Sequence, residues 1–395
     1  MSVWSSLVGQ EAAVAKLSEA AASARAIVAS RGGRASDEAR SMSHAWLITG
    51  PPGSGRSVAA RAFAAALQCT GETPGCGQCP GCRTTMARTN ADVVFAATET
   101  SIINVETARS LVLQAQSSPS QGLWRVIVVE DADRLGESGA NALLKAIEEP
   151  PEHTVWLLCA PSPEDMIATI RSRCRHLGLR IPTAAAVADL LVREGVATPD
   201  VALDAARAAQ SHIGLARALA RDPQMRERRR AIITAPASVR SVGEAVMAAD
   251  RLLETAKAQA DAQVSERNAR EKAELMRQLG MDEGESATKA SRTMIRQLEE
   301  DQKRRSKRAL TDAIDRALID LLAIYRDVLM VQVGGDGELI NTDLSDLVHE
   351  IAQDSTPRQT FARVDHIETA RKRLVSNGNP LLVLEDMAIS LRPQA

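Results

Sequence analysis

The stretch that decides the fold is residues 44–57, which read HAWLITGPPGSGRS. Its apolar first half is typical of a short buried strand, and the Ala-rich residues 56–68 predict a helix directly after it. Between the two, Gly50, Gly53 and Gly55 let the backbone turn so that consecutive N–H groups and a helix N-terminus can face phosphate oxygens. The stretch therefore predicts a phosphate-binding loop, with a chance Gly/Pro-rich turn as the alternative.

This loop departs from the usual pattern at the position where a lysine reaches the terminal phosphates of a nucleotide. Arg56 stands at that position and Ser57 follows it. Arginine keeps the positive charge, but its planar guanidinium is larger than an ammonium and directs its donors differently. The substitution leaves weak binding of ATP with Mg²⁺ open and argues against efficient hydrolysis.

The rest of the first 180 residues alternates short apolar segments with helical ones. Strands are predicted at 124–129 and 154–160, and helices at about 10–30, 104–116 and 138–148. Strands that alternate with helices predict an α/β fold, a parallel sheet with helices on both faces. No strand is predicted beyond about Pro182.

Everything after Pro182 has helical periodicity, so we expect three domains. The expected boundaries are 1–181 for the α/β domain, 182–235 for a small helical lid and 236–395 for an all-helical collar. Within the collar, residues 261–310 carry 22 charged side chains, ten acidic and twelve basic, with a glycine-containing break at 279–284. This insertion is either a projecting helical hairpin or partly disordered.

Two acidic residues follow the second predicted strand. Glu130 and Asp131 stand where a nucleoside triphosphatase holds Mg²⁺ and positions the attacking water. The usual order is Asp then Glu, so the second carboxylate here is shorter by one methylene and lies farther from the water. A solvated turn after a strand is the alternative interpretation.

Four cysteines follow the loop helix, at positions 69, 76, 79 and 82. Thiolates at this spacing, with glycines between them, fit a tetrahedral structural Zn²⁺ site formed by Cys69, Cys76, Cys79 and Cys82. The segment is too irregular for us to expect a helix or strand in it. Four free cysteines in a loop are the alternative, and Cys159 and Cys174 are expected to be buried and structural.

Composition excludes several classes of protein. Of 395 residues, 45% are hydrophobic and 25% charged, and the net charge is −2, which is not basic enough for a surface that grips nucleic acid throughout. Aromatic residues make up only 2%, too few for a platform that stacks single-stranded DNA. The N-terminal residues do not resemble a signal peptide and no membrane span is expected, so we expect a cytoplasmic protein.

Four further short stretches carry a resemblance. Residues 8–10 read VGQ, 141–151 read NALLKAIEEPP, 172–174 read SRC and 214–219 read GLARAL. Together with the phosphate loop and the cysteines, they resemble bacterial clamp-loader proteins of the AAA+ superfamily, which include gamma/tau and delta-prime subunits of DNA polymerase III. The resemblance covers residues 1–235 well and the collar more loosely, and segment 261–310 lies outside the family pattern.

The resemblance implies roles for particular residues. The implied nucleotide-binding set is Val8, Gly50, Gly53, Gly55, Arg56, Ser57, Glu130, Asp131 and Arg217. Val8 lies beside the adenine pocket in such proteins, and Arg217 either senses nucleotide or braces the lid. Lys145 is on a helix that lies near DNA in the family, although a solvated helical lysine is the alternative.

Three departures weaken the implied ATPase. Besides Arg56 and the inverted acid pair, the sensor position that usually offers Thr or Asn is Ala160 or Pro161, so a contact to phosphate or water is lost. These departures favour the delta-prime type, which resembles a clamp-loader ATPase but typically does not hydrolyse ATP. The chain also ends soon after the collar, without the long tail of the tau type.

Arg173, in the SRC stretch, is the residue that the resemblance makes functional. In related loaders this arginine reaches into the ATP site of the neighbouring subunit as an arginine finger. The alternative is that Arg173 only pairs with a local carboxylate.

On this interpretation the chain is a scaffold that joins gamma/tau and delta subunits in a ring through its collar. The assembly opens the sliding clamp and places it on primed DNA, and the chain is an accessory subunit of the DNA polymerase holoenzyme without independent ATPase activity. Two alternatives remain, namely an active gamma-like ATPase and a zinc-containing DNA-binding repair protein.

Overall fold

The computed structural model describes residues 2–30, 41–96, 103–279 and 289–392, and for Lys289 and Ala290 only the backbone. The chain divides into two units, Met1–Ala220 and Arg221–Ala395, which we describe separately. The expected boundaries at 181 and 235 remain predictions.

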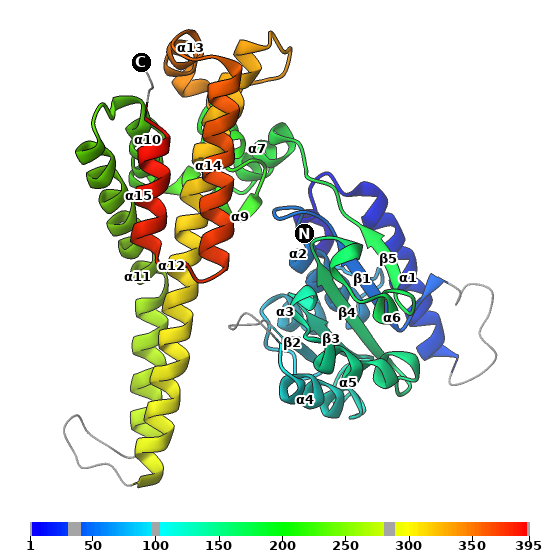
Figure 1. Ribbon diagram of the computed structural model, residues 1–395. Coiled ribbons are helices and arrows are strands. Elements are labelled where there is room, and N and C mark those ends of the chain that lie inside the picture. Colours follow the sequence, from blue (N-terminus) through cyan, green and yellow to red (C-terminus); the bar gives the residue numbers. More distant parts are fainter. Residues whose placement is uncertain (1, 31–40, 97–102, 280–288, 393–395) are drawn as a thin grey trace. The chain divides into compact units, whose positions relative to one another are not determined.

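A parallel sheet forms the centre of the first unit (Figure 1). Among the described residues its strands are β1 (Ala45–Thr49), β2 (Val93–Ala96), β3 (Arg125–Val129), β4 (Thr154–Ala160) and β5 (Arg175–Gly178), in the order β2-β3-β4-β1-β5. The three strands expected from the sequence are β1, β3 and β4, and their residues are buried throughout. Neither β2 nor β5 was predicted from the sequence. In β5 only Leu177 is buried, so this strand has no apolar run that would reveal it.

Helices cover both faces of this sheet, as predicted. On one face, α1 (Glu11–Ala29) and α2 (Arg56–Leu67) pack on strand residues that include Trp46 and Ile48. On the other, α4 (Val105–Ala115) and α5 (Glu137–Glu148) pack on residues that include Leu47 and Ile127. Consecutive residues of β1 thus serve opposite faces, because side chains alternate along a strand.

The cysteine segment contains a helix that we did not expect. α3 (Pro80–Met86) begins with proline in its first turn, and the Cys79 sulfur accepts a hydrogen bond from the Cys82 N–H. Proline is favoured at the start of a helix because its missing N–H would lack an intrahelical partner there. The prediction that this segment holds neither helix nor strand was therefore wrong.

Short helices complete the first unit. They are α6 (Ala168–Arg171), α7 (Ala184–Arg193), α8 (Pro199–Ala208) and α9 (Ile213–Arg221), the last of which ends at the boundary between the units. Each of α7 and α8 starts after a threonine, and the side chain of Thr183 accepts a hydrogen bond from the Ala186 N–H.

The second unit is entirely helical in the part that the structure describes. Its helices are α10 (Pro223–Ser238), α11 (Val242–Gln278), α12 (Lys289–Gln332), α13 (Ser345–Gln353), α14 (Pro357–Val375) and α15 (Pro380–Ser390). The apolar stripe predicted on α12 lies in its core, where Ile314, Leu318, Leu321, Tyr325 and Val328 are buried and Leu310 is partly buried. The α/β sheet followed by an all-helical region confirms the expected fold class.

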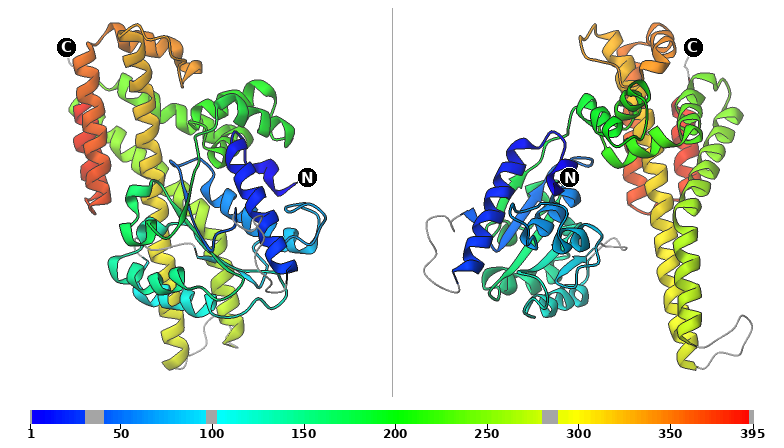
Figure 2. Two further views of the ribbon diagram at one scale, coloured as in Figure 1. Left: turned by 90° about the vertical axis from the view of Figure 1, so that its right-hand side faces the viewer. Right: turned by 180° about the vertical axis from the view of Figure 1, so that it is seen from behind.

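Two long helices, α11 and α12, lie side by side as a hairpin (Figure 2). At 1.5 Å per residue they are about 55 and 65 Å long. Small apolar residues near Ala260 and Ala309 pack between them, and Arg305 donates to Glu271 at 2.8 Å. Both described arms of segment 261–310 are therefore helical, while residues 280–284 of the predicted break lie outside the described part.

Within the residues that the structure describes, none of the helices combines the length and the apolarity that crossing a lipid bilayer requires.

Candidate functional site

The predicted phosphate loop lies at the carboxyl end of β1 and leads into α2. Gly53 and Gly55 have φ values of 90° and 89°, in the left-handed region that glycine adopts most readily, and Gly55 caps α2. The Arg56 guanidinium turns back on the loop, where its Nη1 donates to the Gly50 carbonyl at 2.8 Å. The charge that would replace the usual lysine is thus already hydrogen-bonded to the loop itself.

The loop is held from two sides. Gln10 is buried, and its Nε2 donates to the carbonyl oxygens of Arg180 at 2.5 Å and Ser54 at 3.3 Å. On the other side, His212 lies so close that a Cβ added to Gly53 would be 3.1 Å from the His212 Cα. A glycine is therefore required at position 53 both for its φ and for this close approach.

Val8 lines an open cleft of about 520 Å³ in the same unit. Apolar walls come from residues such as Trp4 and Val192, and Asp189 and Arg193 supply polar groups. A mostly apolar cleft with a few polar groups is the kind of space that a flat base occupies. The role beside a base that the resemblance implies for Val8 stays a prediction.

The acids that follow β3 already face arginines. Glu130 Oε1 lies 2.5 Å from Arg88 Nη2, and Asp131 Oδ2 lies 4.0 Å from Arg134 Nε. Burial raises the pKa of the next acid, Asp133, and the charge of Asp131 acts in the same direction. The carboxylates expected to serve Mg²⁺ are therefore partly neutralised by the chain's own cations.

The sensor position offers no side-chain hydroxyl. Ala160 is fully buried at the end of β4, and the carbonyl of Pro161 accepts a hydrogen bond from the Gly50 N–H at 3.1 Å. This residue thus supports the loop through its backbone. Neither Ala160 nor Pro161 has a side-chain group that could donate a hydrogen bond to phosphate or water.

The four cysteines come together as predicted. Their Sγ atoms all lie within 4.8 Å of one another, and Cys79 Sγ is 3.8 Å from Cys69 Sγ. In a tetrahedral zinc site with Zn–S bonds of about 2.3 Å, the sulfur atoms are about 3.8 Å apart. The cluster can therefore hold a metal ion with little rearrangement.

The backbone favours thiolates in this cluster. Burial works against ionisation, but backbone N–H donors outweigh it and lower the pKa of Cys79 to about 5 and that of Cys69 below its ordinary value. Burial instead raises the pKa of Cys82. Metal binding requires deprotonated thiolates, so the lowered pKa values of Cys79 and Cys69 favour it and the raised pKa of Cys82 opposes it.

The two other cysteines are separate from this cluster. Burial raises the pKa of each thiol to about 12. Cys159 is fully buried in β4, as expected, whereas Cys174 is only half-buried, so its prediction was partly wrong.

Arg173 stands on the turn that ends α6. It is 37% exposed, donates to the Thr169 carbonyl at 2.7 Å and forms an ion pair with Glu148. The local carboxylate named as the alternative partner is therefore present. Because the pair is exposed, it leaves the guanidinium accessible from solvent.

The remaining predicted residues are on helices. Arg217 on α9 forms two hydrogen bonds of 2.9 Å to Glu194, at the end of α7, so it braces these two helices. Ser57 is half-buried in the first turn of α2, and Lys145 is exposed on α5.

Two residues beside the loop were missed in the sequence, Arg88 and His212. Neither belongs to a local motif, since each comes from a connection and reaches the site only through the fold. A positive φ of 61° at Arg88, unusual for a residue other than glycine, is visible only in the structure.

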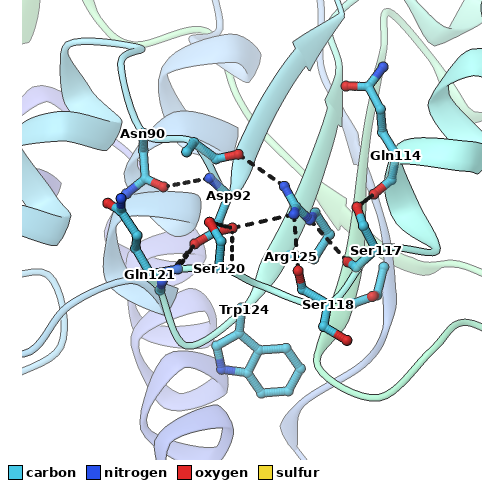
Figure 3. A network of polar contacts seen from close by, with 12 residues as sticks. Asn90, Asp92, Gln114, Ser117, Ser118, Ser120, Gln121, Trp124 and Arg125 are labelled. Carbon is cyan, nitrogen blue, oxygen red and sulfur yellow. Dashed lines mark hydrogen bonds and ion pairs between the residues drawn. The ribbon is translucent and has the colours of Figure 1, made fainter.

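A buried network lies at the start of β3, away from the loop (Figure 3). Asp92 is fully buried and accepts hydrogen bonds from the backbone N–H groups of Ser120, Gln121 and Gly122 at 2.6–2.8 Å. Arg125 lies 3.4 Å from the same carboxylate. This network fixes the connection between α4 and β3 and so anchors the strand that ends in Glu130.

Comparisons with known proteins agree with this geometry. Residues 34–183 match the protein family described as DNA polymerase III, delta subunit. The chain is 35% identical over 170 residues to the DNA polymerase III subunit gamma/tau of Mycobacterium tuberculosis, covering 41% of this chain and 29% of that protein. It is 35% identical over 161 residues to the delta' subunit of Pseudomonas aeruginosa, covering 40% of this chain and 48% of that protein.

A solved structure of a DNA polymerase III gamma subunit-related protein from Thermotoga maritima aligns with 89% of this chain and 94% of its own. The TM-score is 0.43 and the sequence identity 16%.

The first unit is thus an α/β module with a loop of the phosphate-binding type and a cysteine cluster. Its residues 34–183 match the family of DNA polymerase III delta subunits, and about two fifths of the chain are similar to gamma/tau and delta' subunits. The chain spans about a third to a half of the length of the two curated relatives described above.

Proposed function

We propose that this chain is a delta-prime-type subunit of a DNA polymerase III clamp loader, which does not hydrolyse ATP itself. In this proposal it assembles with gamma/tau and delta subunits through its helical second unit, and it supplies Arg173 to an ATP site on a neighbouring gamma/tau subunit. The assembly loads the sliding clamp on primed DNA in the cytoplasm, and the cysteine cluster holds a structural Zn²⁺.

The observation that carries the proposal is the state of the chain's own loop site. Arg56 is bonded to Gly50, Glu130 is paired with Arg88, and residues 160 and 161 offer no hydroxyl. Phosphoryl transfer depends on positioning and charge stabilisation by groups of this kind, so their loss at three places argues against rapid turnover.

Arg173 is suited to act on another subunit. Exposed ion pairs are worth only about 0–1 kcal/mol, so exchanging Glu148 for a phosphate on a neighbour costs little. An arginine supplied in this way raises phosphoryl transfer by about 10³–10⁵ in analogous enzymes. Loss of this arginine should lower the rate of hydrolysis by a similar factor, so Arg173 is the residue to test.

The test is ATP turnover by the chain mixed with gamma/tau, delta, sliding clamp and primed DNA. With Arg173→Ala, hydrolysis at the adjacent site is expected to fall by about 10³-fold or more, so the turnover of the mixture loses at least the share of that site. Arg171→Ala is the matched control, because Arg171 is an exposed arginine two residues before Arg173 and its side chain donates to the Pro163 carbonyl at 3.2 Å.

A further variant separates the two partners of Arg173. Glu148→Gln removes the local carboxylate but leaves the arginine, so turnover should be kept. Unchanged turnover with Arg173→Ala, in a mixture shown by gel filtration to contain the variant, would refute the finger role.

An active gamma-like ATPase is the second candidate. The equal identity to a gamma/tau and a delta' subunit, 35% in both cases, favours keeping it. ATP turnover by the chain alone separates the two candidates. The similarity to DNA polymerase III subunits favours both candidates over a zinc-containing repair protein.

A further inference from the structure

The ion pair between Arg88 and Glu130 occupies the carboxylate that a metal-dependent nucleotide site would use. Glu130 is the first acid after β3, and its side chain is only 15% exposed. Its Oε1 accepts a hydrogen bond of 2.5 Å from Arg88 Nη2. A guanidinium at that distance is in the contact shell of the carboxylate oxygen, where a cation would otherwise bind.

Arg88 is placed for this contact by its surroundings. It lies two residues beyond α3, its backbone N–H donates to the Thr85 carbonyl at 3.0 Å, and its φ of 61° turns the chain there. The guanidinium carbon lies 5.0 Å from the centre of the Phe95 ring, a favourable cation–π distance. Ring and carboxylate together fix both the stem and the head of this side chain.

Other cations surround the same acid. Burial, followed by the charge of Arg88, lowers the pKa of Arg61, while Glu130 raises it, so Arg61 lies close to both. The next acid, Asp131, has Arg134 at 4.0 Å. The positive charge that a divalent ion would contribute here is therefore already supplied by side chains.

A divalent ion would have to compete with these contacts. Mg²⁺ demands near-ideal octahedral oxygen ligands, is reluctant to lose its water, and in nucleotide sites depends on one or two carboxylates. At this loop the carboxylate of Glu130 is paired with Arg88. Asp131 has the shorter side chain and faces Arg134. The described residues thus do not fit Mg²⁺ as the fold's active members would hold it.

We propose that Arg88 is a specificity-determining residue that serves as a built-in counter-cation for Glu130 and excludes divalent metal from this loop. A nucleotide phosphate that binds here is then bound without Mg²⁺. The inference takes from the proposed function only that the loop is a nucleotide site; the exclusion of metal from Glu130 holds whether or not Arg173 acts in trans.

The test is a Mn²⁺ titration of the full chain followed by electron paramagnetic resonance, with the cysteine cluster loaded with zinc beforehand. Mn²⁺ is a paramagnetic substitute for Mg²⁺ and prefers oxygen ligands to thiolates. Wild-type protein is expected to show no Mn²⁺ site that depends on Glu130. Arg88→Ala should create one, with an affinity at least about tenfold higher, and adding Glu130→Gln should abolish it.

Three controls make the result decisive. Arg83→Ala removes an exposed arginine from α3, the helix that precedes Arg88, and should leave Mn²⁺ binding as in wild type. Arg88→Gln keeps most of the side-chain volume and replaces Arg88→Ala if the latter does not fold. ADP binding should be measured with Mg²⁺ and with EDTA. The dissociation constant should be the same under both conditions in wild type and should differ between them in the variant.

The proposal is overturned if wild type binds Mn²⁺ through Glu130 as tightly as the variants do, or if removing Arg88 creates no site. Either outcome would remove one of the three observations behind the proposed function without deciding it, because that is decided by Arg173 in the reconstituted mixture. If ADP does not bind in any condition, the Mn²⁺ titration alone decides.

Discussion

Strand β3 has an acid–arginine pair at each of its ends, and the two pairs differ in almost every respect. At the start, Asp92 is 0% and Arg125 10% exposed, and backbone N–H donors surround the carboxylate. At the end, Glu130 is 15% and Arg88 42% exposed, and a single short contact joins them.

The difference separates a rigid structural pair from one held by a single contact. Arg125 also donates to the carbonyl oxygens of Ala91, Ser117 and Ser118, so neither member of the buried pair can leave without several broken bonds. Arg88 and Glu130 are joined by one ion pair on a more accessible part of the unit, so their contribution to stability is expected to be smaller. A protein that retains the architecture of a nucleotide site but not its chemistry keeps the first pair rigid and adapts the second.

The largest change in the free energy of unfolding is expected when a cysteine of the metal-binding cluster is replaced. The cluster includes Cys82 on α3, the helix that leads to Arg88. Cys82→Ser should reduce bound metal from one ion per chain to nearly none. It should also lower the free energy of unfolding by about 5 kcal/mol, less than the roughly 10–16 kcal/mol of zinc binding in small fingers that have little other core. Metal analysis and chemical denaturation measure both.

Cys174→Ser is the control for this change, since Cys174 lies outside the cluster. Hydrogen exchange sharpens the comparison of the two ends of β3. Amides of residues 80–88 should exchange faster in Cys82→Ser, while those of 120–126 keep their protection relative to the rest of the unit. An equal increase in amide exchange at residues 80–88 and 120–126 would contradict the difference between the two ends of β3.

A smaller effect, about 3–5 kcal/mol, is expected from Asp92→Asn, which leaves Arg125 buried without its counter-ion. Burial opposes ionisation of Asp92, but the N–H donors of Ser120, Gln121 and Gly122 outweigh it and hold its pKa below the ordinary value. The stabilisation is therefore complete above the unfolded pKa of about 3.9 and is lost as pH falls through the lower folded value.

Denaturant unfolding of wild type and Asp92→Asn across pH measures this. The gap in free energy should be constant from about pH 5 to 7 and narrow only below about pH 4. Asp200→Asn changes an exposed acid in the same unit and should stay within about 0.5 kcal/mol of wild type. A gap that narrows near neutral pH would show that Asp92 is not the ionised, hydrogen-bonded acid described here.

The smallest effect is expected for the pair at the other end of β3. A double-mutant cycle with Arg88→Ala and Glu130→Gln should give a coupling energy of about 0.2–1 kcal/mol. Chemical denaturation at low salt measures it, and added salt should reduce it. A coupling energy as large as that of a buried pair would contradict the difference between the two ends of β3.

The sequence predicted those parts of the fold that depend on local pattern. The residues of β1, β3 and β4 form apolar runs, and the loop beginning at Gly50 sits between a strand and a helix as its composition requires. β5 was missed because an edge strand with one buried residue has no such run. The α3 helix was missed because glycine and proline around the cysteines hid a capped start.

The candidate site divides in the same way. The four cysteines are close to one another in the sequence, and so are the three loop glycines. Their spacing was therefore enough to predict the cysteine cluster and the loop. Arg88 lies 42 residues before Glu130, and the contact depends on where the fold places the chain after α3 relative to the end of β3, which no local pattern encodes. The partner of Arg173, Glu148, was likewise predictable only as some carboxylate.

Steady-state ATP turnover by the purified chain alone, with Mg²⁺ present, would decide whether this chain hydrolyses ATP. We expect turnover at background level, equal in wild type and in Arg56→Ala, because Arg56 and Glu130 are both engaged within the chain. Sustained turnover that Arg56→Ala abolishes would contradict it and would make this chain an active ATPase of the gamma type.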